Sequence, residues 1–294
     1  MAEIHRLIGD VRQVIYVKLS LFDKLVNLLL LIQEETMGDF SSVSREGGLT
    51  IITIERPEVM NSLHPPGNAE LAGIFDDFVA DPEQWVAIIT GAGDRAFSAG
   101  NDLKYQASGG DMSGQPSSGF AGLTSRFDNP KPVIAAVNGV AMGGGFEIAL
   151  ACDLIIASDN AIFAFPEPRV GLAALAGGIH RLPREIGMKQ AMGMLLTGRR
   201  VSAEEGKQLG FVNDVVPAGE ALEGAKKWAE LILECAPLSV RGSKQAAMDG
   251  MNADSLEAAI KGKYEQIQAM YKGSDFVEGP LAFSEKRAPN WKGE

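Results

Sequence analysis

The pattern of hydrophobic residues predicts strands that alternate with helices, followed by a purely helical end. Short apolar runs predict buried strands at Leu49–Glu55, Val86–Thr90, Val133–Val137, Leu154–Ala157 and Ile162–Phe165. Helical periodicity predicts helices at Glu70–Val79, Gly144–Ala151, Lys189–Leu196, Ala203–Leu209, Ala221–Cys235, Leu238–Asp249 and Ala253–Tyr271. Strand–strand–helix units recur loosely in the first part of the chain. The pattern therefore predicts an α/β core with a C-terminal helical subdomain.

Two segments lie outside this alternation. Residues 1–40 form an N-terminal extension, in which the apolar stretch Val11–Ile32 is interrupted by polar residues. The stretch is too short and too broken to span a membrane, and it lacks a small-residue cleavage site. We expect an amphipathic helix there, of unknown role. The segment Ala107–Gly122 is rich in Gly and Ser, and we expect a mobile loop.

Composition narrows the class of partner. The chain has 294 residues, of which 46% are hydrophobic and 22% charged, and its net charge of −11 argues against nucleic acid or an anionic membrane as a partner. Cys152 and Cys235 are far apart without CxxC spacing, which favours a reduced, cytoplasmic protein. His5, His64 and His180 show no ligand spacing, so we expect no metal site.

A glycine-rich segment after a predicted strand is the first candidate for chemistry. Asn138-Gly139 marks a turn, and Gly143–Gly145 opens an apolar helix that carries Glu147. The first amides of a helix have no partner within it and carry partial positive charge. Such donors could stabilise a developing oxyanion. Alternatively, the glycines serve close packing and Glu147 only complements the helix dipole.

A second loop, Ala96–Leu103 with the sequence AFSAGNDL, follows the carboxyl end of the strand Val86–Thr90. Ligands gather at such strand ends in α/β sheets. Gly100 and its small neighbours leave backbone amides accessible, although the loop could simply be a tight connection.

A third candidate is Glu167, which lies between Pro166 and Pro168 at the end of a short strand. A stiff backbone suits a group that must be positioned. Glu167 lies 20 residues after Glu147, so the two carboxyl groups could converge. The alternative is a solvated turn glutamate paired with Arg169.

Other catalytic templates do not fit. Gly91-Ala92-Gly93-Asp94-Arg95-Ala96 matches the dinucleotide pattern GxGxxA, with Asp111 twenty residues beyond the first glycine. The pattern requires a helix at once, whereas a loop is expected here. The chain has no GxxxxGK[ST] loop and no GxSxG elbow.

Several motifs occur together, in order, between about Leu49 and Trp291. They are RPEVMNSL at 56–63, AFSAGNDL at 96–103, the segment 132–153, FPEPRVGL at 165–172, AGG at 176–178 before RLP at 181–183, LTGR at 196–199, APLSVRGSK at 236–244 and EGPLAFSEKRAPNW at 278–291. Together they closely resemble the enoyl-CoA hydratase/isomerase (crotonase) superfamily. About the first 40 residues lie outside the resemblance.

The resemblance implies an α/β fold of the crotonase type, a spiral of repeated ββα units. We assign residues 41–235 to this core and residues 236–294 to a C-terminal helical subdomain that builds homotrimers, commonly paired into hexamers. The resemblance also implies an acyl-CoA thioester as substrate, with no cofactor beyond the CoA that the substrate carries.

By motif position, the resemblance implies that the N–H groups of Asn101 and Gly144 hold the thioester oxygen. It implies that Glu147 and Glu167 are the acid–base pair of a hydratase, which adds water across the 2,3 double bond of a 2-enoyl-CoA to give a 3-hydroxyacyl-CoA. In this hypothesis Glu147 activates the water, and Glu167 exchanges the proton at Cα.

The resemblance also implies CoA contacts. These are Arg56, Asp102, Leu103 and Lys104, and, from a neighbouring subunit, Phe283 and Lys286. For the cations the alternative is a solvated surface position, and for Phe283 a packing role.

The chain departs from the family pattern in one loop. Residues 171–178 lack the usual proline, and Leu175 replaces a glycine, which leaves the acyl preference open. A carnitinyl-CoA-type dehydratase, a Δ3,Δ2-enoyl-CoA isomerase and a catalytically silent acyl-CoA-binding protein are the alternatives. Isomerase relatives with a GNDL sequence tend to lack the second glutamate, which this chain keeps as Glu167.

Overall fold

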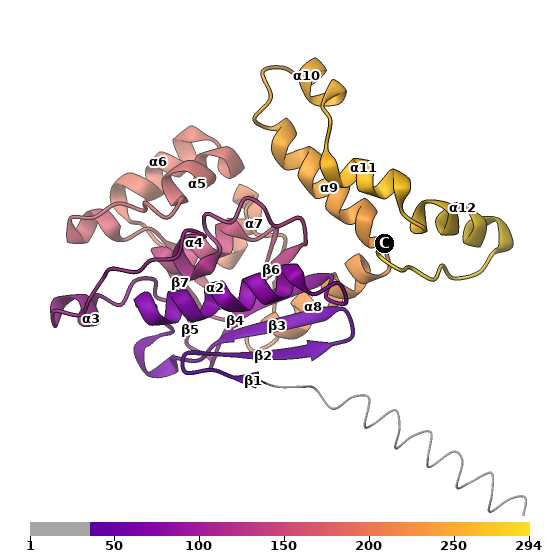
Figure 1. Ribbon diagram of the computed structural model, residues 1–294. Helices are drawn as coiled ribbons and strands as arrows, with labels where there is room; N and C mark the ends of the chain where they lie inside the picture. The colour runs from indigo at the N-terminus through magenta and orange to yellow at the C-terminus, as the bar shows by residue number, and fades with distance from the viewer. Residues whose placement is uncertain (1–35) are drawn as a thin grey trace, which may run out of the picture.

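The computed structural model describes residues 36–294, so the helix predicted at Val11–Ile32 lies outside the described residues (Figure 1). A larger sheet has the strand order β1-β2-β3-β4-β6-β8-β11. Its strands are β1 (Thr36–Met37), β2 (Ser41–Glu46), β3 (Leu49–Ile54), β4 (Val86–Gly91), β6 (Val133–Val137), β8 (Leu154–Ser158) and β11 (Asp214–Val216). The strands from β3 to β11 are parallel, and β1 and β2 complete the sheet in antiparallel fashion.

A smaller sheet has the order β10-β9-β7-β5. Its strands are β5 (Ala96–Ser98), β7 (Val140–Met142), β9 (Ile162–Ala164) and β10 (Val201–Ser202). The helices of the core are α2 (Pro65–Ala80), α3 (Leu103–Ala107), α4 (Gly144–Ala151), α5 (Gly178–Ile186), α6 (Met188–Thr197), α7 (Ala203–Leu209) and α8 (Ala221–Leu233), with the short 3₁₀ helices η1 (Pro57–Val59), η2 (Phe120–Gly122) and η3 (Glu167–Val170).

The chain passes repeatedly through two strands and then a helix. β4 and β5 precede α3, β6 and β7 precede α4, and β8 and β9 precede η3 and α5. In each unit the first strand joins the larger sheet and the second joins the smaller one. The prediction of repeated ββα units is therefore confirmed, and the loops that follow the second strands lie at the same end of neighbouring units.

Alternate residues of the central strands face two separate apolar layers. In β4, Ala87 and Ile89 belong to the main core, whereas Val86 and Ile88 pack against the layer formed with α8. This alternation follows from the period of two along a strand. Burial on both faces explains why these strands read as continuous apolar runs.

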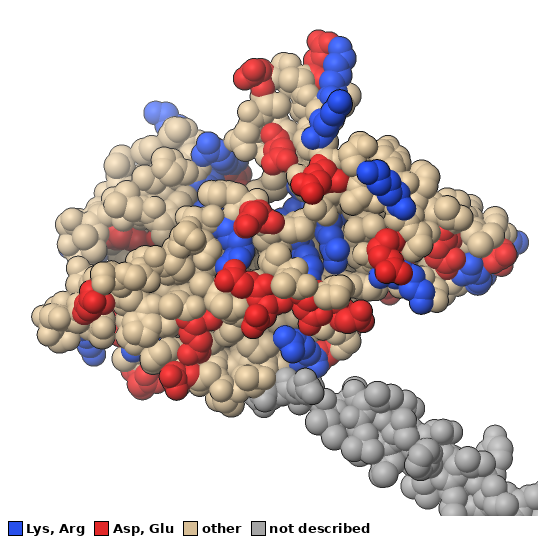
Figure 2. Space-filling view, in the orientation of Figure 1, with Lys and Arg blue, Asp and Glu red and all other residues tan. Residues whose placement is uncertain are grey.

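The chain ends in four helices that extend away from the sheets in Figure 1. They are α9 (Pro237–Gly250), α10 (Leu256–Lys261), α11 (Glu265–Lys272) and α12 (Asp275–Glu285). Lys244 on α9 joins them to the core, since its Nζ donates to Lys131 O at 2.9 Å and to Asp153 Oδ2 at 2.8 Å. Figure 2 shows Lys and Arg side chains gathered in the hollow between the core and these helices.

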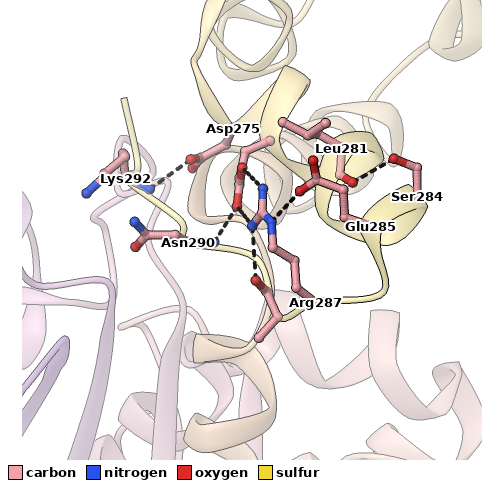
Figure 3. Close-up of polar contacts among 9 residues, drawn as sticks. Asp275, Leu281, Ser284, Glu285, Arg287, Asn290 and Lys292 are labelled. Carbon is pink, nitrogen blue, oxygen red and sulfur yellow. Dashed lines mark hydrogen bonds and ion pairs between the residues drawn. The ribbon is translucent and has the colours of Figure 1, made fainter.

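The last residues fold back onto this helical region (Figure 3). Arg287 binds both carboxylate oxygens of Glu278, at 2.6 and 2.9 Å, and also the carboxylate of Glu285. The carboxylate of Asp275 accepts the N–H groups of Lys292 and Gly293. The tail is thus held by charge-assisted hydrogen bonds rather than by an apolar core.

Some predicted elements are wrong in extent. The loop predicted from Gly91 to Gly100 contains β5, and the helix predicted to start at Glu70 begins at Pro65, because proline suits the first turn of a helix. The single helix predicted over Ala253–Tyr271 is two helices, α10 and α11, since Gly262 adopts an extended conformation after α10. Within residues 36–294, no helix is both long and apolar enough to cross a membrane.

Candidate active site

The two glycine-bearing loops meet directly. Gly100 has a φ of +84°, and a Cβ there would lie 2.7 Å from the backbone nitrogen of Gly144 and 2.7 Å from Met142 O. Both the left-handed conformation and this close approach require glycine. Glycine at position 100 therefore allows Asn101 to lie beside the start of α4.

Two backbone N–H groups at this junction are free. Asn101 lies between a hydrogen bond from Leu63 N–H to Gly100 O and one from Asp102 N–H to Leu63 O, both 2.8 Å long. In this pattern the N–H of Asn101 points away from Leu63. Gly144 is the first residue of α4, so its N–H has no acceptor inside the helix. Among residues 36–294, neither N–H donates a hydrogen bond.

Glu147 lies in the first turn of α4 and is 4% exposed. One of its carboxylate oxygens accepts the N–H of Gly178, the first residue of α5, at 2.8 Å. Burial raises the pKa of Glu147 to about 7, and the charge of Glu167 adds to the rise. The N–H groups of Gly178 and Ala176 and the charge of Arg181 oppose it. A carboxyl group with this pKa can hold or release a proton near neutral pH.

Glu167 opens η3 and is half-buried. Its Oε2 is buried and has no hydrogen-bond partner within residues 36–294, and burial raises the pKa of this carboxyl group as well. A Cβ on Gly143, which has a φ of +54°, would lie 2.9 Å from Glu167 Oε1. The second carboxyl group therefore lies against the residue that precedes Gly144.

The structure thus brings together four of the predicted site residues: Asn101, Gly144, Glu147 and Glu167. The alternative pairing of Glu167 with Arg169 is wrong, because Arg169 Nε donates instead to Thr197 O at 3.0 Å. A desolvated carboxylate without a partner is costly unless it has a use, so the arrangement favours a chemical role.

The residues predicted to contact CoA are divided between two places. Arg56 and Asp102 are paired with each other, with Arg56 Nη2 3.0 Å from Asp102 Oδ2, next to the free N–H of Asn101. Leu103 and Lys104 are exposed on α3. These CoA contacts stay predictions.

Phe283 and Lys286 lie on and directly after α12, and Phe283 is 87% exposed. Figure 1 places α12 and α3 at opposite ends of the molecule. Within one chain, these two residues are therefore not brought to the site.

Three neighbours of the site were not predicted. The ring of Phe120 packs against Gly144, since a Cβ there would lie 2.6 Å from the ring. Gly178 supplies the hydrogen bond to Glu147. Arg181 lies near Glu147 and also donates to Thr124 O at 2.8 Å, so it joins α5 to the segment after η2. The AGG and RLP motifs contain Gly178 and Arg181, but nothing local indicated their contacts.

A cavity of about 310 Å³ adjoins Glu167. It lies between η3, the loop that follows η3, and the helices α5 and α6, and apolar side chains form most of its lining. Its apolar lining residues are Phe165, Pro168, Ala173, Ala174, Ile179, Met192, Leu195 and Leu196. The space next to this carboxyl group therefore suits an apolar group.

The segment Gly91–Ala96, which matches the dinucleotide pattern only in sequence, has no helix directly after it. β4 ends at Gly91 and the chain enters strand β5 at Ala96, so the segment is a strand-to-strand connection. This geometry contradicts a dinucleotide site at Gly91–Ala96. Among residues 36–294, no group of three or more His, Cys, Asp or Glu side chains is arranged to hold a metal ion.

Comparison with known proteins agrees with this geometry. The family model described as Enoyl-CoA hydratase/isomerase matches residues 44–294. A protein named carnitinyl-CoA dehydratase from Escherichia coli strain K12 is 41% identical over 267 residues, which cover 87% of this chain and all of that protein. The crystal structure of enoyl-CoA hydratase from Mycobacterium tuberculosis H37Rv has a TM-score of 0.81 at 36% identity and covers 87% of this chain and all of its own. The crystal structure of carnitinyl-CoA hydratase from Mycobacterium avium has a TM-score of 0.69 at 39% identity and covers 88% of this chain and all of its own.

Proposed function

The chain belongs to the enoyl-CoA hydratase/isomerase family, and we propose that it interconverts a 2-enoyl-CoA and the corresponding 3-hydroxyacyl-CoA by adding or removing water. One observation carries this proposal: two carboxyl groups with raised pKa values, Glu147 and Glu167, flank the start of α4 beside two free N–H groups. Hydration takes one proton from water and delivers one proton to Cα, and a pair of carboxyl groups in different protonation states can perform these two steps.

The N–H groups of Asn101 and Gly144 are proposed to bind the thioester oxygen. When water adds to Cβ, electron density moves through Cα to this oxygen, and an enolate forms. Main-chain donors that are fixed beforehand stabilise that charge without reorganisation. The N-terminus of α4 adds the positive end of the helix dipole.

Glu147 is proposed to take a proton from water as the water oxygen bonds to Cβ, and Glu167 to give a proton to Cα. Hydration thus starts with Glu147 ionised and Glu167 protonated and ends with the two states exchanged. Dehydration runs the same steps in reverse. The mutual repulsion that raises the pKa of Glu147 favours a single proton on the pair.

Replacing each glutamate by glutamine tests the assignment. We expect Glu147→Gln and Glu167→Gln each to lower kcat for hydration of crotonyl-CoA by about 10²–10⁴, because each removes a general acid or base. Glu257→Gln is a matched control, since Glu257 is exposed on α10 and, within the part of the chain that the structure describes, forms an ion pair only with Lys261 of its own helix. Full activity in either site variant would remove that residue from the mechanism.

A second candidate is the dehydration of carnitinyl-CoA, named in relatives that are 41% identical. The bonds that form and break are the same, but that acyl group carries a quaternary ammonium. Turnover of carnitinyl-CoA, of crotonyl-CoA and of a 3-enoyl-CoA, measured side by side, separates dehydratase, hydratase and isomerase activities. Acyl-CoA binding without any turnover would indicate a silent relative.

The remaining parts of the proposal concern CoA and assembly. Leu103 and Lys104 on exposed α3 are placed to meet the CoA moiety, and Phe283 and Lys286 would reach it only from another subunit. We therefore propose a homotrimer or a dimer of trimers built through residues 236–294. Light scattering after size exclusion measures the mass, and a monomer that retains full activity would contradict the shared site.

A further inference from the structure

A buried ion pair lies directly behind the proposed oxyanion site. Arg56 and Asp102 are 46 positions apart, yet Arg56 Nη2 lies 3.0 Å from Asp102 Oδ2. The two side chains are only 13% and 7% exposed. The phosphates of CoA carry strong hydration, so a cation that binds them is expected at an accessible edge, and this guanidinium is instead directed inward.

Each partner is held by further contacts. Arg56 Nη1 donates to Ser62 O, and the guanidinium lies 5.8 Å from the centre of the Phe40 ring. Asp102 Oδ1 accepts the N–H of Tyr105 at 3.1 Å, which makes Asp102 the N-cap of α3. The pair therefore ties the start of α3 to the segment 56–62.

Asn101 precedes Asp102, and its orientation depends on that residue. Leu63 holds Gly100 O and the N–H of Asp102, one on each side of Asn101. The N–H of Asn101 belongs to the 100–101 peptide. The contact of the Asp102 side chain with Arg56 anchors the residue that follows Asn101, and so limits displacement of the 100–101 peptide. A donor in an oxyanion site must lie about 2.7–3.1 Å from the oxygen it stabilises, so a small rotation would be costly.

We propose that Arg56 is a positioning residue that acts through Asp102 to direct the N–H of Asn101 toward the thioester oxygen. The inference rests on the proposed function, and it gives Arg56 a role in polarising the thioester in place of a contact with CoA. Arg56 itself touches neither the substrate nor the reacting atoms.

The test uses Arg56→Met, Arg56→Lys, Asp102→Asn and the double variant Arg56→Met with Asp102→Asn. Asparagine at position 102 keeps the N-cap acceptor and loses the charge. Lysine at position 56 keeps the positive charge and a long aliphatic side chain. Arg56→Lys therefore still tests the proposal if Arg56→Met fails to fold. Lys226→Met is the matched control. Lys226 lies on α8 and also forms a part-buried ion pair, in this case with Glu46 on β2.

Four quantities are measured on the full chain: kcat and KM for crotonyl-CoA, the Kd of free CoA by calorimetry, and the infrared carbonyl frequency of bound butyryl-CoA labelled with ¹³C at the thioester carbon. Butyryl-CoA cannot be hydrated, and a stronger hydrogen bond lowers its carbonyl frequency. We expect Arg56→Met and Asp102→Asn to lower kcat by about tenfold to a hundredfold, below the loss of a whole donor. We also expect a higher carbonyl frequency, an unchanged Kd for CoA, and a double variant no worse than either single one.

A weaker Kd for CoA with unchanged kcat and carbonyl frequency would overturn the inference and make Arg56 a CoA contact. A lower kcat with an unchanged frequency in folded Arg56→Lys and Asp102→Asn would also overturn it. If the unmodified protein binds butyryl-CoA without lowering the carbonyl frequency, the proposed oxyanion site itself fails, and this inference fails with it.

Discussion

The oxyanion loop, residues 96–102, and the acid loop, residues 167–178, border the same site but are held in different ways. The oxyanion loop is bonded to a distant segment: Ala99 N–H donates to Met60 O at 2.9 Å, and Ser98 Oγ donates to Asn61 O at 2.8 Å. The acid loop is bonded largely to itself, as in the 2.9 Å bond from Leu172 N–H to Glu167 O. The loop that carries the proposed thioester donors is thus fixed to a distant segment, whereas the loop proposed to meet the acyl group is held mostly by its own bonds.

The exposed fractions of the side chains also differ between the oxyanion loop and the acid loop. Ala96, Phe97 and Ser98 are at most 1% exposed, whereas Leu172 is 48% and Leu175 is 76% exposed. A segment with few outside bonds and exposed apolar side chains opens at low cost. The difference indicates that substitutions in the two loops have different effects: lost rate in the first, altered substrate preference in the second.

The largest expected effect comes from breaking the oxyanion loop at its closest contact. We expect Gly100→Ala to lower kcat by about 10²–10³, because the new methyl would meet Gly144 N and Met142 O and separate the two donors. Steady-state hydration of crotonyl-CoA measures the loss. Gly171→Ala in the acid loop is the matched control, since Gly171 also has a positive φ but no atom within 4 Å of its would-be Cβ. Equal losses of kcat in the two variants would contradict the proposed difference between the two loops.

The next largest expected effect is on stability, because burial of the ionised carboxyl group of Glu147 destabilises the folded protein. The pKa of Glu147 rises from 4.5 to about 7 on folding, so the folded chain binds the extra proton between these pH values, and stability falls as the pH rises through them. At about 1.4 kcal/mol per pKa unit, the cost above pH 7 is on the order of 3 kcal/mol. We expect Glu147→Gln to be more stable than the unmodified protein at pH 8 and to lose that advantage near pH 4.5. Thermal unfolding at both pH values measures this, and a variant less stable at pH 8 would contradict it.

A smaller effect tests how the site sets that pKa. In the proposed mechanism hydration requires ionised Glu147, so we expect kcat to fall as the pH drops below about 7. Because the charge of Arg181 lowers the pKa of Glu147, Arg181→Met should move this acid limb to higher pH, whereas Arg181→Lys should move it less. The pH dependence of kcat measures the limb. Movement to lower pH would show that Arg181 does not act on Glu147 through its charge.

The smallest expected effect lies at the tip of the acid loop. We expect Leu175→Gly, which restores the glycine usual in the family, to leave the free energy of unfolding within about 1 kcal/mol, because Leu175 is 76% exposed. The ratio of kcat/KM values for short and long 2-enoyl-CoAs should change instead. An unchanged ratio across chain lengths would indicate that this tip does not meet the acyl group.

The sequence predicted the central strands β3, β4, β6 and β8 because they carry a local signal, whereas the six-residue strand β2, with the polar sequence SSVSRE, was missed. Strands buried on both faces read as apolar runs, and the approach of Gly100 to Gly144 requires glycine whatever the surroundings. The strands β5 and β7 are three residues long, like the predicted β9, but they were missed because nearby glycines made both segments read as loops.

The polar contacts behind the site could not be predicted in the same way. Asn61 has a φ of +53° and donates to Ala92 O and Ala96 O, more than thirty positions away. The pairing of Arg56 with Asp102 likewise depends on how distant segments fold together. Asparagine is the side chain that most often tolerates such a conformation, which is the one local signal that Asn61 carried.

The two free N–H groups have a consequence for how such a site can evolve. Both donors belong to the main chain, so a mutation at codon 101 that changes Asn101, whose own amide only reaches Gln106 Oε1 at 2.9 Å, leaves the donor in place. If these N–H groups bind the thioester as proposed, Glu147 or Glu167 can be replaced during evolution while the thioester-binding donors are kept. The reaction that is catalysed can then change in evolution before the CoA-bound form of the substrate does.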